Sequence, residues 1–246
     1  MRTVVRICVA MALLVLQCGL AVATVTLVGT RVVYSMNAKF ADVTAENSGK
    51  QSAQMVAWID DGDINSTPDT SSAPFLLAPA VKVIGPGRKQ VVRIAYSGGS
   101  LPSDRETVYY LNITEIPPKS VGSQSNPVVQ LAVRTRIKIF MRPAGLPVEP
   151  IAAARKLSWE LAADSDGVLI RAKNPSPYFI SMASVTLMRG DTILADLDRG
   201  MVPPWGQSEF HLPTGAVDIS GATAVSYVYV NDYGGGEAFT FTLPVR

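Results

Sequence analysis

The sequence predicts an all-β protein made of two β-sandwich domains. Short runs rich in Val, Thr and Tyr, in which apolar and polar residues alternate, recur along the chain and are separated by turn-forming residues. No segment shows the helical period of about 3.6 residues, so long amphipathic helices are not expected. The proline-rich linker 144–150 divides the runs into two sets, which predicts one domain over residues 24–143 and another over residues 151–246.

Residues 1–23 are predicted to be a secretory signal peptide. Arg2 and Arg6 precede an apolar run from Ile7 to Val22, and Ala21-Val22-Ala23 has the small residues of a cleavage site. The run is short for a membrane span, which needs about 20 apolar residues. We therefore expect the chain to be exported and the leader to be removed.

Both cysteines, Cys8 and Cys18, lie in this leader. A lipid-modified Cys18 is an alternative interpretation, although the preceding Gln17 is bulky where lipoprotein signals have a small residue. The mature chain would contain no disulfide, even in a compartment that permits one. It would carry 20 basic and 20 acidic residues, because the leader holds two of the 22 basic ones. Nucleic-acid binding normally needs a basic excess, so we expect no nucleic-acid partner.

Seven runs in the first domain are predicted to be strands of an immunoglobulin-like sandwich. They are, in order, Val25–Tyr34, Lys39–Asn47, Gln54–Ile59, Phe75–Val83, Val91–Tyr96, Thr107–Ile116 and Val128–Pro143. Pro74 and Pro79 confine the fourth run to a sheet edge or a bulge, because proline cannot donate a ladder hydrogen bond. The polar segment Asp60–Thr70 lacks the ligand spacing of a calcium-binding loop and is predicted to be a solvated loop.

The run Val128–Pro143 is the longest in the chain. One face would carry apolar residues, namely Val129, Leu131, Val133, Thr135, Ile137, Ile139 and Met141, and the other would carry Gln130, Ala132, Arg134, Arg136, Lys138 and Arg142. At about 3.3 Å per residue it would extend on the order of 50 Å, more than one small sandwich covers. Two interpretations follow: a core strand with solvated bases on its outer face, or a strand that continues past its own sheet and pairs with another chain.

The second domain contains a comparable series of short runs. They are Lys156–Ala162, Val168–Asn174, Tyr178–Arg189, Thr192–Leu197, Gln207–Leu212, Ala222–Val230 and Glu237–Leu243. This series predicts a second β-sandwich. The two halves share no close sequence repeat, so the duplication would be one of architecture only.

The segment Leu101–Pro118, LPSDRETVYYLNITEIPP, resembles the signature of the periplasmic pilus (fimbrial) assembly chaperones, the PapD-like family of the chaperone/usher pathway. Shorter matches extend over the mature chain, in GTRVVY, RTRIKIFMRP, NPSPYFISMASV and VNDYGG. The resemblance implies two immunoglobulin-like domains set at an angle with a cleft between them. It also implies a periplasmic chaperone that binds, folds and caps pilus subunits and delivers them to an outer-membrane usher.

The resemblance assigns roles to individual residues. Arg31 and Lys138 correspond to the basic pair that binds the C-terminal carboxylate of a pilus subunit in the cleft, and such groups donate charge-assisted hydrogen bonds. Val129, Leu131 and Val133 correspond to the donor strand, whose alternate side chains fill the open groove of an incomplete subunit by β-augmentation.

Glu106, Arg142 and Asp232 correspond to the charged network between the domains of the family, which would set the angle of the cleft. The resemblance implies no cofactor, no metal and no small-molecule substrate. A short connection before the donor strand is closest to the subfamily that serves rod-like pili. The sequence leaves open whether the free chaperone hides its donor strand in a self-capping dimer.

Two other classes of function explain less of the sequence. An enzyme is not expected, because the sole histidine is His211 and the chain has no nucleophile elbow, no metal-spaced histidine cluster and no phosphate loop. A secreted two-domain immunoglobulin-like binding or adhesion module remains the alternative. It accounts for the leader and the two sandwiches, but it leaves the Leu101–Pro118 signature without an explanation.

Overall fold

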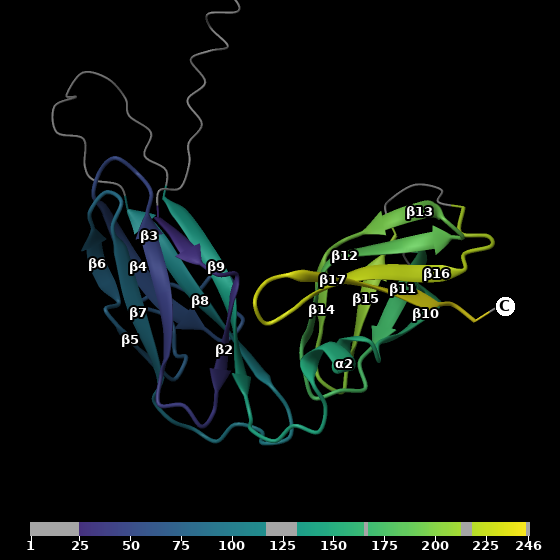
Figure 1. The fold of residues 1–246 in the computed structure, drawn as a ribbon, viewed down its shortest axis with the longest axis horizontal. Helices are drawn as coiled ribbons and strands as arrows, with labels where there is room; N and C mark the ends of the chain where they lie inside the picture. The colour runs from purple at the N-terminus through teal and green to yellow at the C-terminus, as the bar shows by residue number, and fades with distance from the viewer. Residues whose placement is uncertain (1–24, 117–131, 165–166, 213–217, 245–246) are drawn as a thin grey trace, which may run out of the picture.

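The computed structural model describes residues 25–116, 132–164, 167–212 and 218–244. These residues form two β-sandwiches that meet at one end and diverge as the arms of a V (Figure 1). The predicted fold class is therefore confirmed. The predicted signal peptide, residues 1–23, lies outside the described residues. Within the described ranges, no helix has the length and hydrophobicity to cross a membrane.

The first sandwich consists of a four-stranded sheet in the order β1-β3-β7-β5 and a five-stranded sheet in the order β2-β9-β8-β4-β6. The strands are β1 (Val25–Val28), β2 (Arg31–Ser35), β3 (Ala41–Asn47), β4 (Ala53–Asp60), β5 (Phe75–Ala78), β6 (Val81–Ile84), β7 (Lys89–Tyr96), β8 (Thr107–Ile116) and β9 (Val133–Arg142). Strands β2 and β9 pair in parallel, whereas β8 and β9 pair antiparallel.

Two of the predicted single runs are each divided between the two sheets. The first is broken at Gly29, whose φ of +101° is a conformation that favours glycine, so β1 pairs with β3 and β2 with β9. The other is broken at Pro79, so β5 pairs with β7 and β6 with β4. Both β5 and β6 are edge strands, as the prolines predicted.

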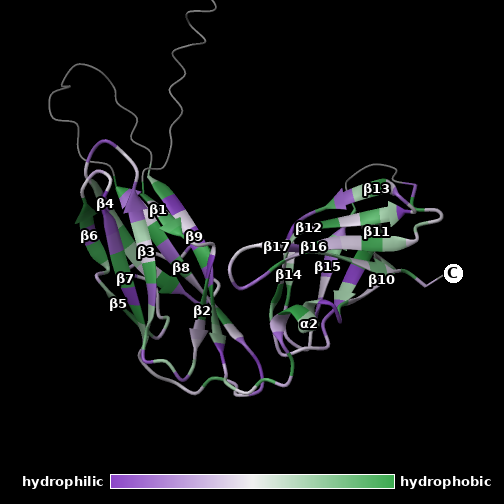
Figure 2. Cartoon of the chain, viewed as in Figure 1, coloured by the Kyte–Doolittle hydropathy of each residue, from purple (hydrophilic) through white to green (hydrophobic). Residues whose placement is uncertain are grey.

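The core of the first sandwich lies between these two sheets. Strand β9 contributes Ile137, Ile139 and Met141, three members of the predicted apolar face, to the buried cluster. Figure 2 shows the same alternation of hydrophobic and hydrophilic residues along many strands of both sandwiches. The second half of the long run is therefore a core strand, as the first interpretation predicted. Residues 128–131 of the run lie outside the described residues.

The second sandwich packs a three-stranded sheet, β10-β11-β15, against a five-stranded sheet with the order β13-β12-β16-β17, in which β14 also pairs with β12. The strands are β10 (Ser158–Asp164), β11 (Gly167–Lys173), β12 (Ile180–Arg189), β13 (Thr192–Leu197), β14 (Gly200–Val202), β15 (Gln207–His211), β16 (Ala224–Val230) and β17 (Gly236–Thr242).

Two short elements of the second half were not predicted, namely helix α2 (Pro150–Ala154) and strand β14. Helix α2 has Pro150 at its start, where a missing N–H costs nothing, and it buries Ala153 and Ala154. Residues 143–149 carry no strand and connect β9 to this helix. The hairpin between β16 and β17 extends from the second sandwich towards the first (Figure 1).

Candidate functional site

The parallel pairing of β2 with β9 brings two cationic side chains together. Arg31 begins β2 and is the register partner of Lys138 in the middle of β9. Register partners on adjacent strands project from the same face of a sheet, so the two side chains are neighbours. Both residues are half-buried. The structure therefore places side by side the two residues that the resemblance assigned to carboxylate binding.

Burial makes this pair of cations electrostatically unfavourable by itself. Desolvation lowers the pKa of Arg31 from its ordinary value, and nearby Tyr229, Asp232 and Glu106 offset only part of this effect. Desolvation also lowers the pKa of Lys138, and repulsion from Arg31 and Arg136 lowers it further. Among the described residues, no carboxylate lies within 4 Å of either cationic group. An anion that entered this site would raise the pKa values of both residues and so favour their charged forms.

One nitrogen of Arg31 is held and another is left without a partner. Its Nη1 donates a hydrogen bond of 2.7 Å to the carbonyl oxygen of Val230, at the end of β16 in the second sandwich. Its Nε is buried and has no hydrogen-bond partner within the part of the chain that the structure describes. A buried donor without an acceptor costs about 1–3 kcal/mol, so an external acceptor is favoured here.

The edge of β9 beside this pair is open. Strand β8 pairs with one edge of β9 from Val133 to Met141. Strand β2 occupies the opposite edge only from Lys138 to Arg142, and no other described strand pairs with that edge from Val133 to Ile137. Val133 is 40% exposed. The other two predicted donor-strand residues, Val129 and Leu131, lie outside the described residues.

A charged network centred on Arg142, the last residue of β9, joins the two sandwiches. The Arg142 guanidinium donates from Nη1 and Nη2 to both carboxylate oxygens of Asp232, at 2.6 and 2.8 Å, and from Nε to Glu106 Oε1 at 2.7 Å. The second oxygen of Glu106 accepts a hydrogen bond of 2.8 Å from the backbone N–H of Phe179. These contacts connect β9 and the residue before β8 to the second sandwich.

The pKa shifts of this network follow from burial and ion pairing. Burial raises the pKa of Glu106, and attraction to Arg142 offsets only part of the effect. Burial lowers the pKa of Arg142, but its hydrogen bonds and attraction to Asp232 and Glu106 outweigh that effect and raise its pKa overall. The structure brings together all three residues predicted for the interdomain network, and their role in setting the angle of the cleft stays a prediction.

Sequence reasoning missed one glycine at this junction. Gly234, in the hairpin between β16 and β17, has a φ of +86°, and a Cβ built on it would lie 2.7 Å from the Thr30 hydroxyl oxygen. The hairpin therefore packs closely against the turn between β1 and β2. The signal was present in the VNDYGG match, because a glycine pair in a hairpin indicates positive φ or close backbone approach.

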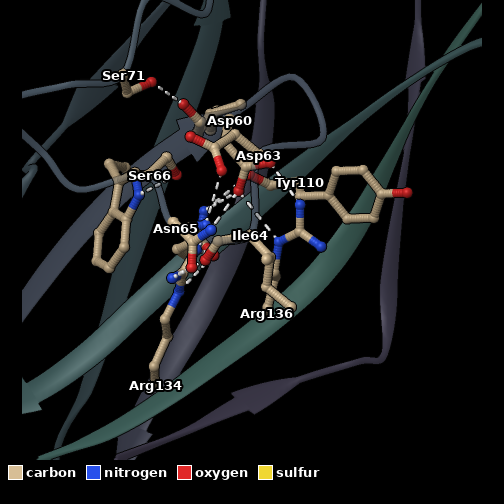
Figure 3. A network of polar contacts seen from close by, with 12 residues as sticks. Asp60, Asp63, Ile64, Asn65, Ser66, Ser71, Tyr110, Arg134 and Arg136 are labelled. Carbon is tan, nitrogen blue, oxygen red and sulfur yellow. Dashed lines mark hydrogen bonds and ion pairs between the residues drawn. The ribbon is translucent and has the colours of Figure 1, made fainter.

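The burial of Asp60 contradicts parts of two predictions, the solvated loop at Asp60–Thr70 and the solvated bases on the outer face of the long run. Its side chain is 1% exposed at the end of β4 and binds Arg136 and Arg134, which project from β9 (Figure 3). The segment Asp60–Thr70 is therefore a solvated loop only after its first residue and apart from the buried Ser66. The outer-face arginines are not solvated either, because their side chains are only 28% and 22% exposed. No group of metal-ligating residues is present within the described ranges.

Comparison with protein families gives two matches that together cover most of the chain. The model described as "Pili and flagellar-assembly chaperone, PapD N-terminal domain" matches residues 24–147. The model described as "Pili assembly chaperone PapD, C-terminal domain" matches residues 152–241.

Individual proteins agree with these matches. The chain is 34% identical over 217 residues to the chaperone protein FimB/FhaD of Bordetella pertussis, which covers 87% of this chain and 85% of that protein. It is 34% identical over 219 residues to the probable fimbrial chaperone YadV of Escherichia coli, with 87% of each chain covered. The crystal structure of YadV superposes with a TM-score of 0.76 at 30% identity and covers 90% of this chain and 100% of that chain.

A more distant structure shares the fold. The SafB chaperone, solved in complex with the SafA pilin of Salmonella enterica, superposes with a TM-score of 0.75 at 23% identity, covering 92% of this chain and 99% of that chain. The sequence resemblance noted at Leu101–Pro118 is thus confirmed over residues 24–147 and 152–241.

Proposed function

This chain belongs to the PapD-like family of pilus-assembly chaperones, and from that premise we propose that it caps pilus subunits by donor-strand complementation and delivers them to an outer-membrane usher. Fimbrial chaperones of this family are periplasmic, so the proposal includes export through the leader at residues 1–23. Its relatives are named as chaperones, which does not favour the alternative of an adhesion module.

The first step of the proposed mechanism is capture of the subunit's C-terminal carboxylate by Arg31 and Lys138. The observation that carries the proposal is the pairing of these two half-buried cations in register, with no carboxylate within 4 Å among the described residues. A carboxylate would accept charge-assisted hydrogen bonds from both groups, including the unpartnered Arg31 Nε. Partial desolvation strengthens such contacts relative to an open surface.

The second step is pairing of the subunit with the open edge of β9. An anchored carboxylate fixes the register of the subunit's last strand relative to Val133–Ile137, where the backbone of β9 has no described strand partner. Alternate apolar side chains, Val129, Leu131 and Val133, then enter the groove of the subunit. If each is fully buried at about 1.5–3 kcal/mol, the three contribute roughly 5–9 kcal/mol.

The remaining residues of the site hold its two strands, β2 and β9, in place. The hydrogen bond from Arg31 to Val230 and the ion pairs of Arg142 with Glu106 and Asp232 tie both strands of the site to the second sandwich. No covalent bond is made or broken in this mechanism. It therefore calls for no catalytic residue and no cofactor, and the usher would release the subunit by exchanging the donor strand.

Replacement of Lys138 by Ala tests the proposal. We expect Lys138→Ala to abolish recovery of the subunit that co-purifies with the wild-type protein from periplasm, because the carboxylate loses one of its two cationic partners. The thermal midpoint of the purified variant should stay close to that of the wild type, since the amine is not ion-paired within the described structure.

Lys89→Ala is the matched control. Lys89 is exposed on β7, in the other sheet of the same domain, and its one ion pair among the described residues is with Glu46. Its replacement should leave the complex yield unchanged. If Lys138→Ala yields as much complex as the wild type, the proposed capture of the carboxylate is wrong.

A further inference from the structure

A polar cluster centred on Asp60 lies on the outer face of the five-stranded sheet (Figure 3). Asp60 Oδ1 accepts hydrogen bonds from Arg136 Nη2 at 2.5 Å and from the backbone N–H of Gly62 at 2.8 Å. Its Oδ2 accepts from Asn112 Nδ2 at 2.7 Å and from Arg136 Nε at 3.1 Å. One buried carboxylate thus joins β4 to β8 and β9.

A second arginine of β9 extends the cluster to the loop after β4. Arg134 donates from Nε and Nη2 to Asn112 Oδ1, at 2.9 and 2.7 Å, and its Nη2 lies 3.6 Å from Asp60 Oδ2. Its Nη1 donates to the carbonyl oxygen of Ile64 at 2.7 Å. The side chain of Arg134 is therefore fixed at all three of its nitrogens.

Aromatic rings support both guanidinium groups. The central carbon of Arg136 lies 3.6 Å from the centroid of the Tyr110 ring, and that of Arg134 lies 4.8 Å from the Trp58 ring. Trp58 is itself oriented by a hydrogen bond of 3.1 Å from Nε1 to the Ser66 hydroxyl. These stacked contacts restrict the rotamers of two side chains that would otherwise be long and mobile.

The cluster coincides with the part of β9 that has the weakest backbone support. Arg134 and Arg136 belong to Val133–Ile137, where β8 occupies one edge and no described strand occupies the other. A terminal strand segment that is hydrogen-bonded on one side opens at low free energy compared with a central strand. The side chains on its outer face are therefore the second means of holding this segment in place.

We propose that Asp60 is a positioning residue for subunit capture, which holds the start of β9 against β8 through Arg134 and Arg136. The open edge from Val133 to Ile137 is then already extended and in register when a subunit arrives. A binding segment that is ordered in advance avoids the entropic cost of ordering on association. This inference rests on the subunit binding proposed above and adds the residues that prepare the strand for it.

Hydrogen exchange of the free protein tests the inference without any partner. In Asp60→Asn, which keeps the size of the side chain but removes its charge, the backbone amides of Val133–Ile137 that point towards β8 should exchange at least about tenfold faster, equivalent to about 1.4 kcal/mol. Amides of the opposite sheet, at Ala45 and Val92, should keep their wild-type rates. The yield of the subunit that co-purifies with the wild-type protein should fall in parallel.

Asp42→Asn is the matched control. Asp42 forms a two-point ion pair with Arg93, at 2.9 and 3.1 Å, but on the exposed surface of β3 and β7 in the other sheet. Its replacement removes the same charge from the same domain and should change neither the exchange of Val133–Ile137 nor the complex yield.

Arg134→Gln is a second test of the same proposal, to be used if Asp60→Asn does not fold. It removes the hydrogen bonds of Arg134 to Ile64 and Asn112 and its contact with Trp58, but it leaves the pair of Asp60 with Arg136. It should speed exchange in Val133–Ile137 with a smaller loss of stability. Equal acceleration of exchange throughout the domain, or none in Val133–Ile137, would overturn the positioning role. A subunit complex that survives Lys138→Ala would instead count against the proposed function, and the exchange result would stand independently of it.

Discussion

The two buried carboxyl groups of the first domain, Asp60 and Glu106, have pKa values that are shifted in opposite directions. Burial raises the pKa of Asp60, but hydrogen bonds from Arg136, Asn112 and Gly62 outweigh it, so that its pKa lies below the ordinary value. For Glu106 burial dominates, and its pKa lies above the ordinary value. Ionised Asp60 therefore stabilises the folded state, whereas ionised Glu106 is tolerated only because Arg142 lies beside it.

The shift at Asp60 predicts a specific pH dependence of stability. A carboxyl whose pKa is lowered by folding contributes stability that is fully present above its unfolded pKa and is lost as the pH falls through the folded value. The difference in unfolding free energy between the wild type and Asp60→Asn should thus be larger at about pH 7 than at about pH 3. Denaturant unfolding at the two pH values measures it, and a difference that does not shrink in acid would contradict the assignment.

The importance of Asp60 could not be read from its neighbours in the sequence. It begins a segment rich in Asp and other polar or turn-forming residues, and local propensity correctly assigns most of that segment to a solvated loop. Its burial depends on Arg136, which lies 76 positions later and reaches it only through the register of β4, β8 and β9. The alternation of Arg134 and Arg136 on one face was visible, but their counter-ion was not.

At the scale of elements, apolar alternation predicted most strands, and turn chemistry decided their ends. Strands β8 and β13 have the predicted bounds because a proline pair follows the first and a tight turn precedes the second. The division of the first run at Gly29 was missed because an isolated glycine does not indicate whether a strand changes sheet. Helix α2 and β14 were missed because each is too short to show a period.

The open edge of β9 gives a prediction for a single side chain. Val133→Ala removes two methyl groups that the proposed mechanism buries in the subunit, at about 0.8 kcal/mol each, so subunit affinity should fall roughly tenfold. Because Val133 is 40% exposed in the free chain, its unfolding free energy should change by less than about 0.5 kcal/mol. Competition between variant and wild type for a limiting amount of subunit measures the affinity.

Val91→Ala is the control for this prediction. Val91 lies on β7 and is 47% exposed, but it belongs to the other sheet. The same truncation there should leave affinity for the subunit unchanged. Equal effects of the two replacements would show that the edge of β9 is not where the subunit pairs.

At the scale of the whole molecule, the site depends on contacts between the two sandwiches. Pattern and composition predicted both sandwiches, but they did not indicate which residues meet at the junction. Glu106, Arg142 and Asp232 lie in segments far apart in the chain, and in the sequence only the family resemblance groups them. Contacts that cross from one domain to another depend on how the domains pack, and no local period encodes that packing.

Removal of Arg142 tests whether this junction holds the domains together. Arg142→Met leaves Glu106, which is 3% exposed, buried without its cation, so the free energy of unfolding should fall by about 3–5 kcal/mol. Glu106→Gln in the same chain should restore much of the loss. Because the pKa of Glu106 is already raised, the single variant should regain stability relative to wild type as the pH falls from about 7 to about 5. Arg93→Met breaks the exposed pair with Asp42 and an exposed contact with the Phe40 ring, and it should cost less than about 1 kcal/mol. Denaturant unfolding measures the loss of stability in each variant. Equal losses in Arg142→Met and Arg93→Met would show that the ion pairs of Arg142 do not hold the domains together.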